Sequence, residues 1–171
     1  MTNTDTHEGL TIIRIFDVPV AKVWDMWTKP ELVKKWWGPE NFYSPGMKID
    51  FRVGGRYIFG MHGPKGSEWD KDMWSAGEYK EIIPYKKIVA TDYFSDKDGN
   101  MIDPSGAGQD SGFPKVLTVT VLFEEVKPGK TKLTVIYPHP ATEEEHEAML
   151  KSGMKEGWES SLEKMQKALV E

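Results

Sequence analysis

Apolar positions that alternate with polar ones run through most of the chain, and this period of two is typical of half-buried β-strands. In one stretch, for example, Leu117, Val119, Val121 and Phe123 share a face. The same pattern predicts seven strands, over residues 10–16, 47–51, 57–61, 73–83, 88–94, 116–124 and 132–137. Most turns between them are short, so we expect a mostly antiparallel sheet.

Two short helices are predicted directly after the first strand. Pro19 suits the first turn of a helix, and Asp17 is a candidate for its cap. Pro30 ends this helix and opens the second one, which Gly38-Pro39 stops.

The C-terminal region carries the longest helical pattern. Thr142 and Glu145 form a Thr-x-x-Glu capping box, which predicts a helix start. Apolar residues then recur every three or four positions, at Leu150, Met154, Trp158, Leu162, Met165 and Leu169. This stripe predicts one continuous helix from the capping box to Leu169.

Small residues form a second stripe on this helix, at Gly153, Gly157 and Ser161. A glycine inside a helix costs about 1 kcal/mol relative to alanine, so each one needs a spatial reason. Close packing against the sheet is one such reason, and space for a bound molecule is the other. The sequence leaves both open.

One connection is unusually long. Residues 95–115 are rich in Asp, Gly, Ser and Pro and exceed a simple hairpin loop, so they form either a mobile flap or a disordered segment. No repeat or second domain is evident. We expect residues 10–171 to form a single domain after a disordered tail at residues 1–9.

Composition narrows the class of protein. The 171 residues carry a net charge of -5, which argues against nucleic-acid binding because that needs clustered Lys and Arg. The lack of cysteine excludes disulfides and Cys–zinc sites and fits a cytoplasmic location. No apolar run is long enough to span a bilayer, and the polar N-terminus does not resemble a signal peptide.

The seven tryptophans are the most informative residues, because rings of this size line a core, an interface or an apolar pocket. Several of them lie among segments with a distinctive order and spacing: Arg14-Ile15-Phe16-Asp17-Val18-Pro19, Val23-Trp24, Trp27-Thr28-Lys29-Pro30, Trp36-Trp37-Gly38-Pro39, Asp50-Phe51-Arg52-Val53-Gly54-Gly55-Arg56-Tyr57, Gly77-Glu78-Tyr79-Lys80-Glu81-Ile82, residues 131–135 and Gly157-Trp158. Together these segments resemble the START-like superfamily, also called SRPBCC or birch-pollen-allergen-like. Within it, they look like the branch of the heat-shock ATPase activator's C-terminal domain.

The resemblance covers roughly residues 10–169. It implies an α+β helix-grip fold, in which a curved antiparallel sheet of about seven strands wraps around a long C-terminal helix and leaves a cavity between them. It does not imply a single activity. Relatives include lipid and sterol carriers, hormone receptors, aromatase/cyclase proteins and the co-chaperone domain.

Large apolar side chains from several predicted elements are candidates for the cavity wall: Trp36, Trp37, Phe42, Phe59, Met61, Trp74, Tyr79, Tyr93, Met154 and Trp158. An ordinary hydrophobic core is the alternative for each of them. Four polar residues on predicted strands are candidates for groups that orient a ligand or transfer a proton: Arg14, His62, Glu78 and Asp92. A solvated position or a structural ion pair is the alternative for these four.

Catalytic and metal-binding motifs are weak or missing. Glu143 and His146 have the spacing of metal ligands on a helix, but their exposed, acidic first turn favours solvation. The residues after Asp96 fail the EF-hand pattern, and Gly106-Ala107-Gly108 lacks the context of a dinucleotide site. We therefore expect no metal, no cofactor and no covalent catalysis.

The sequence supports three functional hypotheses. The first is a protein that binds a hydrophobic or aromatic small molecule, lipid-like or polyketide-like, between the sheet and the last helix. A co-chaperone-like module that contacts a chaperone ATPase is an alternative, by resemblance alone. A cyclase- or hydrolase-type enzyme is another, and it needs at least two of the four polar candidates at the cavity. The oligomeric state stays open, and a dimer through exposed sheet edges is compatible with the pattern.

Overall fold

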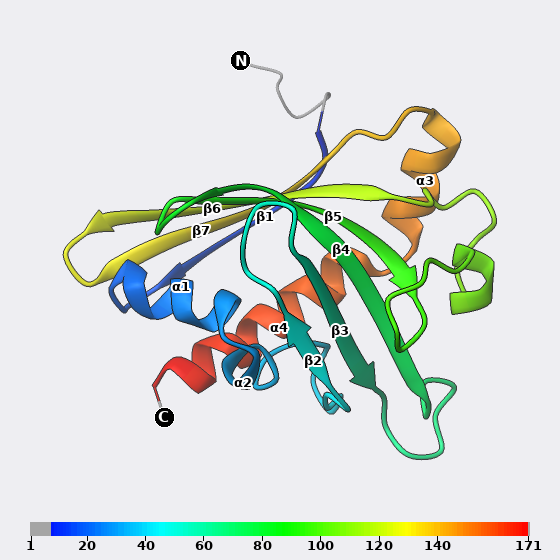
Figure 1. Ribbon diagram of the computed structural model, residues 1–171, viewed down its shortest axis with the longest axis horizontal. Coiled ribbons are helices and arrows are strands. Elements are labelled where there is room, and N and C mark those ends of the chain that lie inside the picture. The colour runs from blue at the N-terminus through cyan, green and yellow to red at the C-terminus, as the bar shows by residue number, and fades with distance from the viewer. Residues whose placement is uncertain (1–7, 171) are drawn as a thin grey trace.

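Seven antiparallel strands form one curved sheet in the computed structural model, which describes residues 8–170 (Figure 1). Their order across the sheet is β1-β7-β6-β5-β4-β3-β2, so the first strand pairs with the last. The strands span Glu8–Phe16 (β1), Met47–Ile49 (β2), Arg56–His62 (β3), Asp72–Ile83 (β4), Lys87–Ser95 (β5), Leu117–Lys127 (β6) and Lys130–Pro138 (β7). Every predicted strand is present, with small shifts at the ends.

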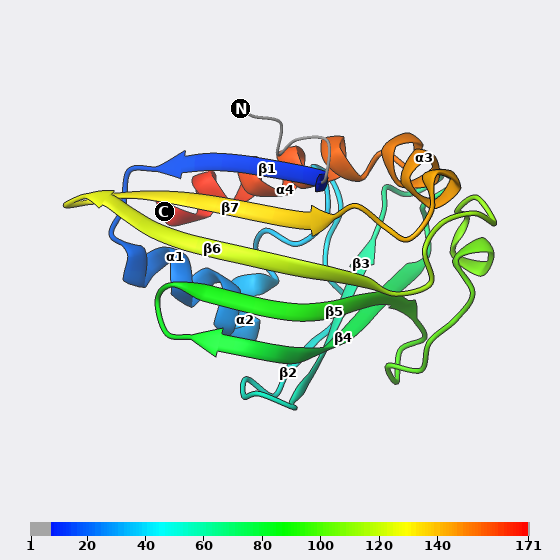
Figure 2. The ribbon, with the colours of Figure 1, turned by 90° about the horizontal axis from the view of Figure 1, so that it is seen from above.

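The described part of the chain also contains four α-helices, at Val20–Thr28 (α1), Pro30–Val33 (α2), Glu143–Lys151 (α3) and Met154–Leu169 (α4). The sheet bends around α4, and α1 and α2 lie on the same side of the sheet as α4 (Figures 1 and 2). This arrangement confirms the predicted helix-grip fold. None of the helices within residues 8–170 has the length and apolar character that crossing a bilayer requires.

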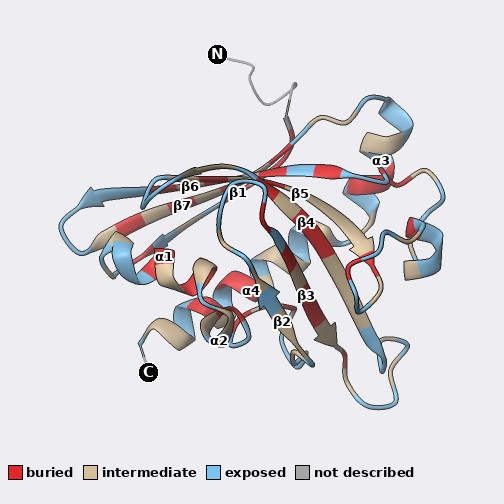
Figure 3. Cartoon of the chain, viewed as in Figure 1, coloured by how far each residue is buried: buried red, intermediate tan, exposed pale blue. Residues whose placement is uncertain are grey.

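The hydrophobic core is made of buried residues from the sheet and from the helices. Figure 3 colours these buried positions along the strands and helices. The inner face follows the predicted alternation, because Val121 and Phe123 of β6 and Leu133 and Val135 of β7 are all buried. Trp27 of α1 meets this layer and stacks on Trp158 of α4, with ring centroids 5.7 Å apart. The alternation of apolar and polar residues therefore correctly predicted which residues of β6 and β7 share the buried face of the sheet.

The C-terminal helix differs from the prediction of one continuous helix, which was wrong. The Thr142–Glu145 capping box is confirmed, but α3 ends at Lys151 and α4 begins at Met154. Between them Gly153 adopts φ 85°, in the left-handed region that a helix cannot continue through. The break turns the chain, and it leaves Leu150, a member of the predicted apolar stripe, 55% exposed.

The start of α1 also differs from the prediction. Pro19 precedes the helix, and no side chain caps it from that position. Asp17, the predicted cap, instead pairs with Lys130 Nζ at 2.7 Å. The Glu125 carboxylate accepts the free N–H of Val20 over 2.7 Å, so β6 supplies the cap from a distant part of the chain.

The N-terminal tail was predicted at residues 1–9. Residues 1–7 of that segment lie outside the described residues. The last two residues belong to β1, and Glu8 already pairs with Pro138 of β7.

Candidate functional site

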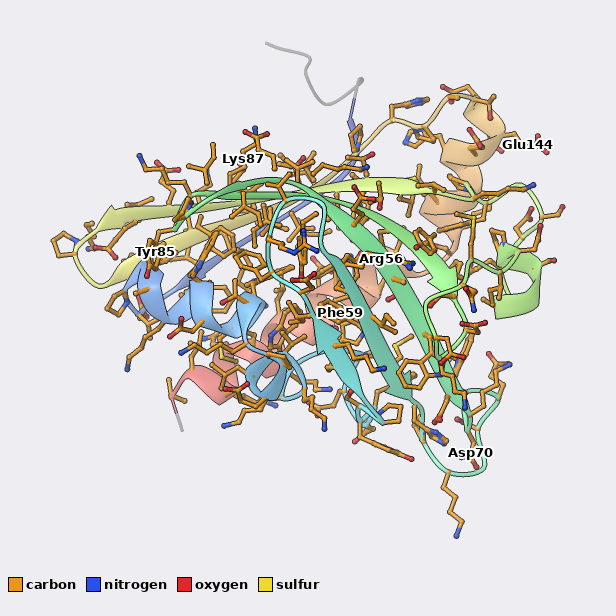
Figure 4. The ribbon with its side chains drawn as sticks, viewed as in Figure 1. Arg56, Phe59, Asp70, Tyr85, Lys87 and Glu144 are labelled. Atoms are coloured by element: carbon orange, nitrogen blue, oxygen red, sulfur yellow. The ribbon has the colours of Figure 1, made fainter. Side chains whose placement is uncertain are left out.

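A cavity of about 610 Å³ lies between α4, the inner face of the sheet and the loop that follows β5. Cavities of this size are typical of small-molecule sites, which bury most of the surface of a drug-sized ligand. Strand β3, whose residue Phe59 is labelled in Figure 4, supplies part of the wall. Strands β4 and β5 and the segment after α2 supply further parts.

Most of the wall is aromatic or apolar. Eight of the ten predicted wall residues line the cavity: Trp37, Phe42, Phe59, Met61, Trp74, Tyr93, Met154 and Trp158. Trp36 and Tyr79 do not. Trp36 is fully buried in the core and donates its indole N–H to the carbonyl of Met26 over 2.7 Å. Tyr79 packs edge-on against Phe51, with ring centroids 5.0 Å apart, and lines a smaller chamber beside the cavity.

A lysine of α4 holds the segment after α2 in place. Lys164 Nζ donates hydrogen bonds to the backbone carbonyls of Gly38, Pro39 and Phe42, over 3.0, 3.2 and 3.1 Å. Partial burial lowers the pKa of this ammonium group. Sequence reasoning missed Lys164, because nothing in the sequence distinguishes one lysine of a lysine-rich helix from another.

Gly157 lies on the face of α4 that lines the cavity. A Cβ built on it would meet only Pro39 Cγ, at 4.0 Å, so no neighbour requires a glycine there. Of the two reasons that the sequence left open, free space therefore fits Gly157. Gly153 has a different reason, because its positive φ ends α3.

The loop at residues 95–115 has a defined conformation and forms one side of the cavity. The Asp96 carboxylate accepts the backbone N–H groups of Asp98 and Asn100, each over 2.9 Å, which closes a tight turn. A short 3₁₀ helix, η2 (Pro104–Ala107), follows it. Phe113 is buried against Phe94, with ring centroids 5.6 Å apart, and anchors the end of the loop at the cavity wall.

Asp92 is the one of the four polar candidates that lines the cavity. Its two carboxylate oxygens lie 3.3 Å from the hydroxyls of Tyr57 and Tyr137. Tyr57 donates its proton to the nearer carbonyl of Thr91, over 2.7 Å, so Tyr137 is the better donor to Asp92. Within residues 8–170, no Lys, Arg or His forms an ion pair with Asp92. Burial raises the pKa of this carboxyl to about 6, against the lowering effect of the two hydroxyls.

A small inner chamber of about 40 Å³ adjoins Asp92. Trp37, Phe59 and Trp158 line both this chamber and the main cavity. Trp27 also lines the chamber, and its buried indole N–H has no hydrogen-bond partner among the described residues. A carboxylate acceptor and an unused N–H donor therefore lie at the apolar inner end of the site.

Arg14 and Glu78 do not line the cavity. Arg14 of β1 donates to the Gln166 side chain over 2.7 Å and pairs with Glu163, which ties β1 to α4. Glu78 of β4 pairs with Lys80 at 3.1 Å on the outer surface. Both residues have the structural ion pairs that were the alternative to a ligand-binding role.

His62 does not line the cavity either, although its partner Asp72 does. Its two ring nitrogens contact Asp72 and Asp70, at 2.6 and 2.8 Å, in the hairpin between β3 and β4 where Figure 4 labels Asp70. These two carboxylates raise the pKa of His62. Tyr43 stacks on the imidazole, with ring centroids 4.9 Å apart. These contacts stabilise the end of the β3–β4 hairpin.

The curved sheet, the gripped α4 and the aromatic cavity define a START-like helix-grip domain. The chain belongs to the family described as Activator of Hsp90 ATPase homolog 1-like protein, whose sequence model matches residues 17–170. This match confirms the resemblance seen in the sequence. A comparison with curated proteins gives no match.

Solved bacterial structures share this fold. Protein Ms6760 from Mycobacterium smegmatis is 26% identical to this chain over 99% of its length and 94% of Ms6760, with a TM-score of 0.74. A protein from Arthrobacter aurescens is 25% identical over 94% of this chain and 84% of that one, with a TM-score of 0.75. Protein NE0264 from Nitrosomonas europaea is 23% identical over 94% and 92% of the two chains, with a TM-score of 0.72.

Proposed function

We propose that this protein binds a hydrophobic or aromatic small molecule in the cavity between the sheet and α4. The observation that carries the proposal is the 610 Å³ cavity with its mostly aromatic wall. Transfer of apolar ligand surface from water into such a site supplies roughly 25 cal/mol per Å². The free space over Gly157 supports the same function, because a glycine there keeps the cavity wide.

Asp92 determines which polar group this ligand carries. Its carboxylate has one favourable donor, the Tyr137 hydroxyl at 3.3 Å, and no cationic partner among the described residues. A buried carboxylate that lacks partners is costly, and a ligand donor lowers that cost. The ligand therefore carries a hydroxyl or amine that reaches Asp92 while its apolar body contacts the aromatic wall.

The first experiment is native mass spectrometry of freshly purified protein, followed by solvent extraction of any bound molecule. A reproducible extra mass is expected in the wild type. The variant Gly157→Leu places a larger side chain in the cavity and should lose that mass. Glu159→Leu adds the same side chain at an exposed position of α4 and is the matched control.

Naphthylmethanol serves as a probe if the protein is purified without a ligand. We expect it to quench tryptophan fluorescence of the wild type and of Glu159→Leu, and to bind Gly157→Leu at least about tenfold more weakly. Equal binding to all three proteins would place the probe outside the cavity and contradict the proposal. Naphthoic acid should bind more weakly than naphthylmethanol, because its negatively charged carboxylate would be repelled by the carboxylate of Asp92.

A co-chaperone-like function is the second candidate, and the family match over residues 17–170 is the observation that favours it. The test is the ATPase rate of purified Hsp90 with and without this protein. A higher rate would support the function, and an unchanged rate at saturating protein would remove it. An enzymatic function has less support, because of the four polar candidates only Asp92 lines the cavity.

A further inference from the structure

Three side chains with metal-ligand chemistry gather at the start of α3, away from the cavity lining. His139 follows β7, and Glu143 and His146 lie one turn apart on the helix. Their ligand atoms all lie within 4.8 Å of one another. The sequence favoured solvation for Glu143 and His146, because they lie in an exposed, acidic first turn. It did not point to His139, which lies in the preceding loop.

Hydrogen bonds to the backbone orient both imidazole rings. His139 Nδ1 lies 2.7 Å from the Pro140 carbonyl, and His146 Nε2 lies 3.4 Å from the Gly9 carbonyl. A carbonyl oxygen only accepts, so these two ring nitrogens carry the hydrogens. Histidines that bind metals use this arrangement, in which a backbone carbonyl holds one nitrogen and the other is free to coordinate.

The two remaining nitrogens face the same carboxylate. His139 Nε2 lies 2.9 Å from one oxygen of Glu143, and His146 Nδ1 lies 3.8 Å from the other. In a neutral imidazole each of these nitrogens holds a lone pair, so both would point a lone pair at an anion. A cation at the centre of the cluster removes this repulsion, because the two imidazoles and the carboxylate then each donate an electron pair to the cation.

The spacing suits a small transition-metal ion. Zinc binds nitrogen and oxygen ligands at about 2.0 to 2.1 Å, so ligand atoms of a tetrahedral site lie roughly 3.3 Å apart. The contact of 2.9 Å from His139 reaches one oxygen of Glu143, the contact of 3.8 Å from His146 reaches the other, and the two distances lie on either side of that value. Two histidines and one glutamate form a known type of zinc site with an open fourth position. Magnesium and calcium prefer all-oxygen ligands and do not suit the two imidazoles.

We propose that His139, Glu143 and His146 bind one zinc ion. The site is independent of the cavity ligand and of the function proposed for the cavity. Solvent reaches the cluster through Glu143, whose side chain is 80% exposed. The zinc ion would connect the residue after β7 to the first turn of α3. The hydrogen bond from His146 Nε2 to the Gly9 carbonyl connects the same turn to β1.

Calorimetric titration of the tag-free, chelator-treated full chain with zinc chloride tests the proposal. We expect one zinc ion per chain and no binding of magnesium chloride. His139→Ala, His146→Ala and Glu143→Gln should each weaken zinc binding at least about tenfold. Glu144→Gln is the matched control, because it removes the same charge from the neighbouring residue, which Figure 4 shows on the outer side of α3. A zinc affinity equal to that of the wild type in all four variants would overturn the proposal.

Nitrogen NMR of the histidine rings gives a second answer that does not depend on the variants folding. With zinc added to the wild type, the signals of His139 Nε2 and His146 Nδ1 should shift, and those of His62 should stay unchanged. A shift confined to other histidines would overturn the proposal. A wild-type protein that binds no zinc at millimolar concentration would also overturn the proposal, because the three side chains would then interact only with one another.

Discussion

Trp158 Nε1 donates a hydrogen bond to the Tyr137 hydroxyl over 3.1 Å, and so connects α4 to β7 at the cavity wall. The same hydroxyl donates to Asp92 of β5 over 3.3 Å. Because the hydroxyl accepts from the indole, its own proton is directed to the carboxylate. Trp158 therefore orients the best donor that Asp92 has among the described residues.

Two substitutions separate the ring of Trp158 from its N–H group. Trp158→Phe keeps an aromatic ring against Trp27 but loses the bond to Tyr137, so we expect a loss of about 1 kcal/mol in the free energy of unfolding. Trp158→Ala also loses the packing, and about 3 kcal/mol is expected. Urea unfolding measures both. Equal losses would mean that the hydrogen bond, and not the ring, carries the stability.

The raised pKa of Asp92 makes stability depend on pH. Burial raises this pKa from an ordinary value near 3.8 to about 6, so between these two pH values the unfolded chain loses the proton and the folded chain keeps it. The folded state then binds more protons, and stability falls as pH rises through this window, by about 3 kcal/mol in total. Tyr57 and Tyr137, the titratable groups that face Asp92, have raised pKa values and stay protonated.

Asp92→Asn isolates this effect, because asparagine does not titrate. The variant should gain stability relative to the wild type between pH 4 and pH 6 and keep that advantage at pH 7. Urea unfolding of both proteins at each pH provides the measurement. A constant difference across the range would show that the carboxyl titrates alike in the folded and unfolded chains.

The fold was predictable because strand and helix periods are local signals. The alternation in β6 and β7 and the capping box at Thr142 identify elements without reference to the rest of the chain. The break at Gly153 was not predictable in the same way, because the apolar stripe continues across it. A glycine within a helical pattern fits either a helix interior or a left-handed turn.

The cavity was only partly predictable. Adjacent residues such as Trp36 and Trp37 have the same chemistry, and only the three-dimensional path after α2 turns one into the core and the other toward the cavity. Glu78 and Asp92 both lie on strands, yet only Asp92 has tyrosine hydroxyls beside it. Such contacts join distant parts of the chain, which a single sequence does not reveal.

Lys164 should be a key residue for the cavity wall. Lys164→Met keeps the length of the side chain but removes three hydrogen bonds to the segment after α2. We expect a loss of about 2 to 3 kcal/mol in chemical unfolding, because carbonyls lose donors in a partly buried place. Lys167→Met is the control. That lysine pairs only weakly with Glu40, at 3.4 Å on the surface, so less than about 0.5 kcal/mol is expected.

Gly77 occupies a place in β4 where no side chain fits. A Cβ built there would lie 1.8 Å from the Thr91 carbonyl oxygen and 2.7 Å from the ring of Tyr57. Gly77→Ala should therefore lower the free energy of unfolding by about 3 kcal/mol or more, or prevent folding. Gly106→Ala is the control, because nothing lies within 4 Å of the added atom. Thermal unfolding compares them, and similar midpoints would contradict the close β4–β5 approach.

Gly153 and Gly157 lie four residues apart, and the structure predicts opposite effects of the same substitution. Gly153 has φ 85°, so Gly153→Ala should cost about 1 to 2 kcal/mol. Gly157 is helical with free space for a Cβ, so Gly157→Ala should add about 0.5 to 1 kcal/mol. Urea unfolding measures both, and circular dichroism reports helix content. A Gly153→Ala protein that gained both stability and helix would mean that α3 and α4 prefer to join, in which case the break has no intrinsic backbone cause.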